Sequence, residues 1–175
     1  TYMMVSNHQS IVDIFALFRT FFHFKWVSKI ENFRMPFIGW NMRLNKYIAL
    51  ERGSVKGGAE MMRQCEEHLR QGSSLFIFPE GTRSSHGKLG VFKRGAFELA
   101  KRTEVPILPL VLDGSSNAMP KGSVFLRGLH RIRIHVLEPI PVETVRSLSV
   151  EELMALTRQK IADELLLMQG AAATA

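Results

Sequence analysis

The chain has a single cysteine and no apolar run long enough to cross a membrane. Among its 175 residues only Cys65 carries a thiol, which excludes an internal disulfide. Cys65 stands on the apolar stripe of an expected helix, a position more typical of a buried small hydrophobe than of a nucleophile. Asp13 and Arg19 interrupt the most apolar segment, so the sequence holds no stretch of the length needed for a membrane-spanning helix.

Several catalytic and targeting signatures are missing as well. The sequence has no Gly-x-Ser-x-Gly elbow of serine hydrolases, no Gly-x4-Gly-Lys-Ser/Thr phosphate loop and no Cys/His spacing for zinc. It also lacks a signal peptide, yet it begins inside an apolar strand without an initiator methionine. We therefore expect the chain to be the body of a longer protein whose N-terminal part is absent.

Basic residues are in excess. The 23 lysines and arginines against 16 acidic residues give a formal net charge of +7, which favours an acidic partner. Anionic lipid headgroups, phosphorylated substrates, an acidic carrier protein and nucleic acid all fit, and charge alone does not choose among them. Length and a hydrophobic content of 46 % predict one globular domain over residues 1–169, followed by a frayed tail at 170–175.

Expected strands and helices alternate along the chain. Apolar runs predict buried strands at 2–5, 25–28, 47–50, 75–78 and 105–112. Helical patterns follow at 11–24, 56–71 and 93–103, and from the capping box Ser149-x-x-Glu152 to about Met168. The alternation at 131–136 indicates a strand near the sheet edge, and 114–122 reads as a loop. This order predicts an α/β fold with a mostly parallel twisted sheet covered by helices.

A histidine and a carboxylate lie five residues apart where the first strand gives way to a helix. We expect His8 on the connecting turn, Ser10 as the N-cap and Asp13 on the first helical turn, facing His8. A carboxylate that accepts the Nδ1 proton of an imidazole leaves Nε2 free to take a proton from a hydroxyl. The alternative is a capping box, in which Asp13 only stabilises the start of the helix.

Four polar residues come directly after expected strands: His8, Arg52, Glu80 and Arg83. Because ligand sites in parallel sheets lie beyond the carboxyl ends of the strands, we expect these side chains to converge. Two guanidinium groups bind a phosphate through paired hydrogen bonds. The set predicts transfer to a hydroxyl of a phosphorylated acceptor, although each residue alone also fits a loop ion pair or a solvated charge.

The segment 32–43 mixes aromatic, apolar and basic side chains. Two interpretations are equally open: a membrane interface, where rings lie at headgroup level and guanidinium groups meet phosphates, or a helix packed on the core. In the first, the membrane-facing residues are Phe33, Arg34, Phe37, Trp40 and Arg43.

Four blocks of the sequence, in order, resemble the glycerolipid acyltransferase family, in particular its bacterial-type 1-acyl-glycerol-3-phosphate (lysophosphatidic acid) acyltransferases. The family patterns are His-x4-Asp, Lys-x-Glu-x4-Pro-x2-Gly, Phe-Pro-Glu-Gly-Thr-Arg-Ser and Val-Pro-Ile-x-Pro. In this chain they correspond to residues 8–13, 29–39, 78–84 and 105–109. One departure stands beside Arg52, where Glu51 replaces the aspartate usual in the family and puts the shape of the acceptor pocket in doubt.

The resemblance implies transfer of a fatty acyl group from acyl-CoA or acyl carrier protein to the free hydroxyl of 1-acyl-glycerol 3-phosphate, giving phosphatidic acid. It implies His8 as general base, Asp13 as its orienting carboxylate and Glu80 as a support for the reacting centre or the acceptor. Arg52 and Arg83 would bind the phosphate. Gly81 and Thr82 would supply oxyanion or loop support.

The same resemblance implies no metal and no cofactor beyond the acyl donor. It places the enzyme on a membrane surface that carries lysophospholipid, at the cytoplasmic face of the inner (plasma) membrane, without a nucleic-acid partner. Two alternatives stay open: an acyltransferase for another lysophospholipid or for glycerol 3-phosphate, and a non-catalytic module that binds anionic lipid.

Overall fold

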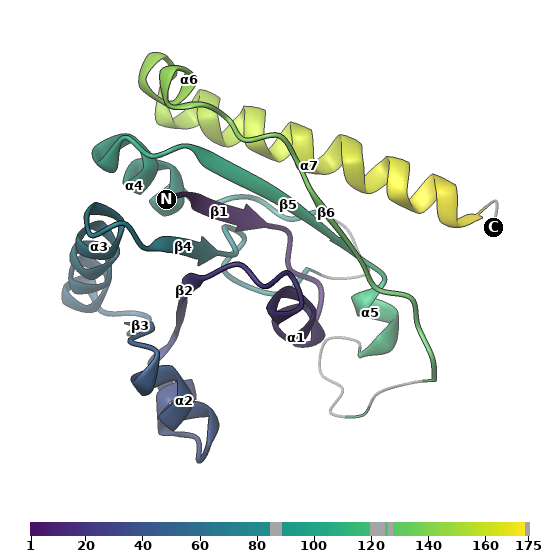
Figure 1. Cartoon of the computed structure of the whole chain (residues 1–175), viewed down its shortest axis with the longest axis horizontal. Helices are drawn as coiled ribbons and strands as arrows, with labels where there is room; N and C mark the ends of the chain where they lie inside the picture. Colours follow the sequence, from purple (N-terminus) through teal and green to yellow (C-terminus); the bar gives the residue numbers. More distant parts are fainter. Residues whose placement is uncertain (85–88, 120–124, 126–127, 174–175) are drawn as a thin grey trace.

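A mostly parallel sheet forms the centre of the protein. The computed structural model describes residues 1–84, 89–119, 125 and 128–173. Within them a six-stranded sheet runs in the order β3-β2-β4-β1-β5-β6, parallel except for the pair β5 and β6 (Figure 1). The strands are β1 (Met3–Ser6), β2 (Phe24–Lys29), β3 (Ile48–Leu50), β4 (Ser74–Ile77), β5 (Ile107–Asp113) and β6 (Arg133–Val136). The predicted α/β fold is confirmed, with β6 at the edge as expected.

Helices cover both faces of this sheet (Figure 1). They are α1 (Val12–Phe18), the 3-10 helix η1 (Ile30–Arg34), α2 (Ile38–Leu44), α3 (Val55–Arg70), α4 (Gly95–Thr103), α5 (Ser115–Ala118), α6 (Val142–Ser147) and α7 (Val150–Ala173). Successive side chains of a strand point to opposite faces, so Met3 and Val5 pack with α3, α4 and α7, whereas Met4 packs with α1. Each face therefore has its own apolar core.

The first helix is shorter than the sequence predicts. It ends at Phe18 instead of Phe24, because the amides of Arg19, Thr20 and Phe21 each bond to the carbonyl three residues earlier and tighten the last turn. Phe21 then has φ of 54°, in the left-handed region, which turns the chain away from the helix. Phe24 is consequently the first residue of β2.

Ser10 is not the N-cap residue of α1, although its hydroxyl accepts the Val12 amide at 3.4 Å as a capping side chain would. Ile11 is the N-cap, without a side-chain cap bond, and the buried Ser10 hydroxyl donates to the Met119 carbonyl at 2.7 Å. The capping box at Ser149 is confirmed, since Glu152 accepts the Ser149 amide at 2.8 Å and its own amide donates to the Ser149 hydroxyl at 3.2 Å.

Two further segments differ from expectation. The predicted loop 114–122 contains α5 up to Ala118, and its residues 120–122 lie outside the described chain. The last helix extends past Met168 to Ala173, so most of the expected frayed tail is helical, while residues 174–175 are not described.

Candidate active site

The carboxyl ends of the strands bring most of the predicted site residues together. His8 comes two residues after β1, Arg52 two after β3, and Glu80 and Gly81 shortly after β4. Hydrogen bonds join His8, Asp13 and Glu80, and Arg52 binds Gly81, the residue after Glu80. Convergence at this edge is what the strand order required.

His8 and Asp13 form a hydrogen-bonded pair. Nδ1 of His8 lies 2.8 Å from Oδ2 of Asp13, and the two side chains are 15 % and 0 % exposed. The same carboxylate oxygen accepts the amides of Gln9 at 2.7 Å and Ser10 at 2.8 Å. Because Nδ1 is engaged, Nε2 is the ring nitrogen available to exchange a proton with another molecule. The capping-box alternative describes part of this geometry, since the Asp13 carboxylate accepts a hydrogen bond from the Ser10 amide in addition to its contact with the imidazole.

The backbone and the ring of His8 are held from three further sides. Its amide donates to Oε1 of Glu80 at 2.8 Å, and its carbonyl accepts the amide of Ser84 at 2.7 Å. The ring stacks on Phe78, with 3.9 Å between centroids and 14° between planes. These contacts fix both the position and the tilt of the imidazole.

Glu80 is buried and acts as a bridge. Its Oε1 accepts the His8 amide, and its Oε2 accepts the Gly90 amide at 2.8 Å. Burial raises the pKa of the Glu80 carboxyl, and the two amide donors oppose that rise. With both oxygens engaged by backbone, the geometry favours support of the reacting centre over contact with the acceptor.

Gly81 occupies the turn after Glu80 with φ of 67°. Its amide donates to the Phe78 carbonyl at 3.0 Å and its carbonyl accepts Nη2 of Arg52. Because that amide is used within the turn, the arrangement favours loop support over oxyanion binding for Gly81. Thr82 is exposed and Arg83 is half-buried on the same loop. Arg83 thus belongs to the loop that Arg52 contacts through Gly81.

Glu51 packs against the first turn of α3. Its Cβ lies within 2.7 Å, and its Oε2 within 3.1 Å, of the point where a Cβ on Gly57 would stand, at the first turn of α3. The absence of a side chain at Gly57 leaves room for the Glu51 side chain at this point.

The segment 32–43 forms η1 and α2, and most of its large side chains are exposed. Phe37 is 75 % and Trp40 57 % exposed, with their rings 5.2 Å apart; Arg34 and Arg43 are exposed and Phe33 is half-buried. Only Gly39 and Met42 of α2 are buried. This distribution disfavours a helix packed wholly on the core.

Sequence reasoning gave no role to two residues that shape the site. The Asn7 amide side chain donates to the Leu112 carbonyl at 2.8 Å and accepts the Leu112 amide at 2.9 Å, which extends the β1–β5 pairing up to His8. Gly90 supplies the second donor to Glu80. Both contacts join positions far apart in sequence, so no local pattern signals them.

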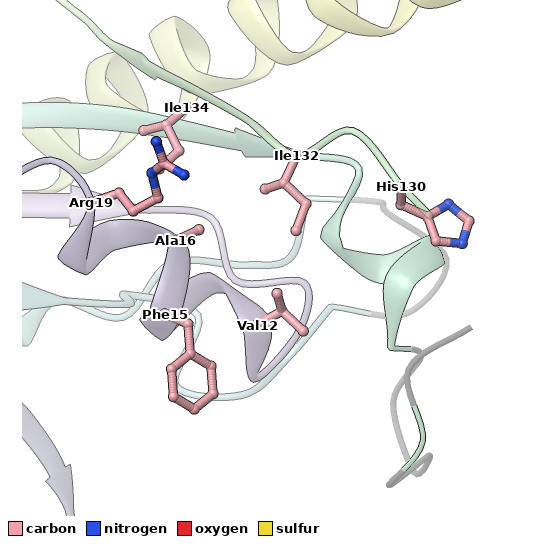
Figure 2. A pocket seen from close by; sticks show the side chains of 7 residues that line it. All are labelled: Val12, Phe15, Ala16, Arg19, His130, Ile132 and Ile134. Carbon is pink, nitrogen blue, oxygen red and sulfur yellow. The ribbon is translucent and has the colours of Figure 1, made fainter. Parts of the chain in front are cut away.

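A separate cleft of about 520 Å³ lies between α1 and the segment leading into β6 (Figure 2). It is lined by Val12, Phe15, Ala16, Arg19, His130, Ile132 and Ile134. No predicted site residue belongs to this lining. Figure 2 shows these side chains, which come from α1 and its C-cap on one part of the chain and from residues 130–134 on the other.

Comparison with known proteins adds independent information. The family model described as Acyltransferase matches residues 1–113. A chloroplastic 1-acyl-sn-glycerol-3-phosphate acyltransferase of Brassica napus is 40 % identical over 136 residues, 78 % of this chain and 40 % of that protein. The protein of the same description from Borreliella burgdorferi is 30 % identical over 164 residues, 93 % of this chain and 65 % of that protein.

A solved structure is also similar. The crystal structure of the 1-acyl-sn-glycerophosphate acyltransferase PlsC from Thermotoga maritima aligns with a TM-score of 0.83 at 27 % identity, over 97 % of this chain and 66 % of that one. The chain spans less than half the length of the plant relatives that it matches.

Proposed function

The chain belongs to the acyltransferase family, and we propose that it transfers a fatty acyl group from a thioester to 1-acyl-glycerol 3-phosphate, giving phosphatidic acid. The donor is acyl-CoA or acyl carrier protein, and no other cofactor takes part. The printed names of the relatives from Brassica napus and Borreliella burgdorferi, and of the Thermotoga maritima structure, support this acceptor.

The observation that carries the proposal is the His8–Asp13 pair, with 2.8 Å between Nδ1 and Oδ2. Nε2 of His8 takes the proton of the acceptor hydroxyl as its oxygen attacks the thioester carbonyl. The Asp13 carboxylate stabilises the imidazolium that forms. When the carbon–sulfur bond breaks, the thiolate takes the proton from His8, so the products are an ester and a free thiol.

We assign the remaining residues by their contacts. Glu80 supports the loop that carries His8, since it binds the His8 amide. Arg52 and Arg83 bind the acceptor phosphate, because Arg83 belongs to the loop after β4 and Arg52 contacts that loop through Gly81. Gly81 and Thr82 shape that loop.

The proposed enzyme works as a single acyltransferase domain over residues 1–169 at the cytoplasmic face of the inner (plasma) membrane. Within the described residues no helix is both long and apolar enough to cross a bilayer. We assign surface contact to Phe33, Arg34, Phe37, Trp40 and Arg43, because exposed rings beside guanidinium groups suit the headgroup layer. The partners are the lysophospholipid and the acyl donor, without nucleic acid.

Free thiol released from acyl-CoA on addition of 1-acyl-glycerol 3-phosphate tests the activity directly. The acceptor panel adds glycerol 3-phosphate and a lysophospholipid without a terminal phosphate. Fastest release with either of those would assign a different acceptor. Binding to anionic vesicles without thiol release from any acceptor would instead favour a non-catalytic lipid-binding module.

A further inference from the structure

The C-terminal helix α7 reaches the active-site cluster through Arg158. This half-buried side chain donates from Nε to the Gly90 carbonyl at 3.1 Å and from Nη2 to the Leu89 carbonyl at 3.2 Å. Arg158 lies beyond residues 1–113, the part of the chain matched by the family model. Arg158 takes no direct part in the proposed acyl transfer.

The two carbonyls belong to a segment that also touches Glu80. The Leu89 carbonyl and the Gly90 amide are the two ends of one planar peptide group, and in a trans peptide they point in opposite directions. Arg158 binds the carbonyl end, and Oε2 of Glu80 accepts from the amide end at 2.8 Å. One peptide group therefore connects a guanidinium to a buried carboxylate.

A side chain at Gly90 would crowd the Glu80 carboxylate. A Cβ on Gly90 would stand 2.6 Å from Oε2 of Glu80, inside van der Waals contact. The other carboxylate oxygen accepts the His8 amide at 2.8 Å. The connection from Arg158 to His8 thus runs through Gly90 and Glu80 without a gap.

We propose that Arg158 is a positioning residue for the general base His8, acting through the Leu89–Gly90 peptide and Glu80; this rests on the proposed acyl transfer. A cation on the carbonyl polarises the peptide group and strengthens its N–H as a donor. That donor orients Glu80, and Glu80 sets the backbone of His8.

The pKa of Glu80 provides a test of the proposal through the pH dependence of the rate. Burial raises the pKa of Glu80, while the amides of Gly90 and His8 lower it; the His8 ring also lowers it and Asp13 raises it. Weakening the Gly90 donor raises this pKa further, so Glu80 protonates at a higher pH than in the wild type. If the ionised form is needed, the acidic limb of the pH–rate profile moves to higher pH.

The test compares Arg158→Ala and Arg158→Lys with two control variants of α7. Lys160→Ala removes an exposed charge from the same helix. Glu151→Gln removes the ion pair between Arg94 and Glu151, which joins α7 to the N-cap of α4 without using Gly90 or Glu80. Steady-state transfer from acyl-CoA to 1-acyl-glycerol 3-phosphate is measured across pH for each protein, with unfolding temperatures.

We expect Arg158→Ala to lower kcat by about 10- to 100-fold, as misplacement by roughly 1 Å does, with an acceptor KM near the wild-type value. The acidic limb should move to higher pH, Arg158→Lys should show a smaller effect in the same direction, and both controls should match the wild type. If Arg158→Ala does not fold, kcat and the acidic limb of Arg158→Lys test the proposal instead.

Two outcomes are told apart by the wild-type protein. Wild-type kcat and an unchanged acidic limb in a folded Arg158 variant, beside an active wild type, would overturn the positioning role alone. A wild type without any transfer would overturn the proposed function itself. Equal losses in Glu151→Gln would assign the effect to docking of α7 and overturn the specific path through Gly90.

Discussion

Nδ1 of His8 lies 2.8 Å from Oδ2 of Asp13, and that single oxygen also holds the amides of Gln9 and Ser10. The carboxylate is thus fixed by the backbone before it acts on the imidazole. Its orientation does not depend on the protonation state of His8, because two of its three donors are amides.

His8→Ala should lower kcat by about 10²- to 10⁴-fold, the usual contribution of a general base. The ring stacks on Phe78 and is largely buried, so we also expect a lower unfolding temperature with a cooperative transition retained. His135→Ala is the matched control, since His135 pairs with Glu164 at 2.6 Å on the surface outside the site. Near-normal turnover of folded His8→Ala would contradict the mechanism.

Asp13→Asn should reduce kcat by about 10²-fold or more while costing less stability than Asp13→Ala. Asparagine keeps an oxygen for the Gln9 and Ser10 amides but loses the charge that stabilises the imidazolium. Alanine leaves both buried amides without an acceptor, at about 1–3 kcal/mol each. Denaturant unfolding and steady-state rates separate the two effects, and equal activity of Asp13→Asn and wild type would assign Asp13 to a purely structural role.

Ser10→Ala should lower the free energy of unfolding by about 1–3 kcal/mol and leave substantial activity. The buried Ser10 hydroxyl satisfies the Met119 carbonyl, and it takes no part in the direct transfer that we propose. Ser147→Ala, at an exposed hydroxyl, is the control and should be close to neutral. Intact-mass spectrometry during turnover would detect an acyl adduct on Ser6, Ser10 or Cys65, which would contradict direct transfer.

Arg52→Lys and Arg83→Lys should each raise the KM for 1-acyl-glycerol 3-phosphate strongly and leave that for the acyl thioester nearly unchanged. Lysine keeps the charge but loses the planar fork that matches phosphate oxygens. Arg70→Lys, on the exposed face of α3, should change neither constant. A selective rise in the thioester KM would move the affected arginine to the donor site.

Reversing the charges of Arg34 and Arg43 to glutamate should weaken binding to anionic vesicles, and Phe37→Ala with Trp40→Ala should weaken it further. The electrostatic contribution to vesicle binding should diminish with added salt, because the Debye length shortens to about 8 Å at physiological ionic strength. Vesicle sedimentation measures both parts, with Lys160→Glu on α7 as a charge-matched control. Unchanged binding of the arginine variants would remove this segment from the proposed membrane surface.

The strands were predictable because each is a short apolar run bounded by turn residues. All six fall within about two residues of the predicted bounds, and the alternating pattern at 131–136 correctly placed β6 at an edge. The end of α1 was not predictable in this way, since the apolar character continues through Phe21 and Phe22 while the backbone leaves the helix.

The candidate site, too, was predictable only where its contacts are local in sequence. His8 and Asp13 are near neighbours in sequence, and their spacing across a strand-to-helix turn predicts their contact. The bridge from Glu80 to Gly90 and Arg158 depends on how α7 docks, and no local periodicity encodes that. The bond from the Ser10 hydroxyl to the Met119 carbonyl could not be predicted for the same reason, because the two residues are distant in sequence.

The closed ring formed by residues 8–13 has a consequence for engineering. All three donors to Oδ2 of Asp13 come from residues 8–10, so the loop that unites base and carboxylate is closed within a few residues and loses little conformational entropy on ordering. The bonds that orient the Asp13 carboxylate are therefore local, although Phe78, Leu112 and Met119 also hold this turn from other parts of the chain. The proposed catalytic pair is therefore a fragment that a designer can graft onto another parallel sheet, provided that the Glu80 bond and the packing on Phe78 are rebuilt from the new host.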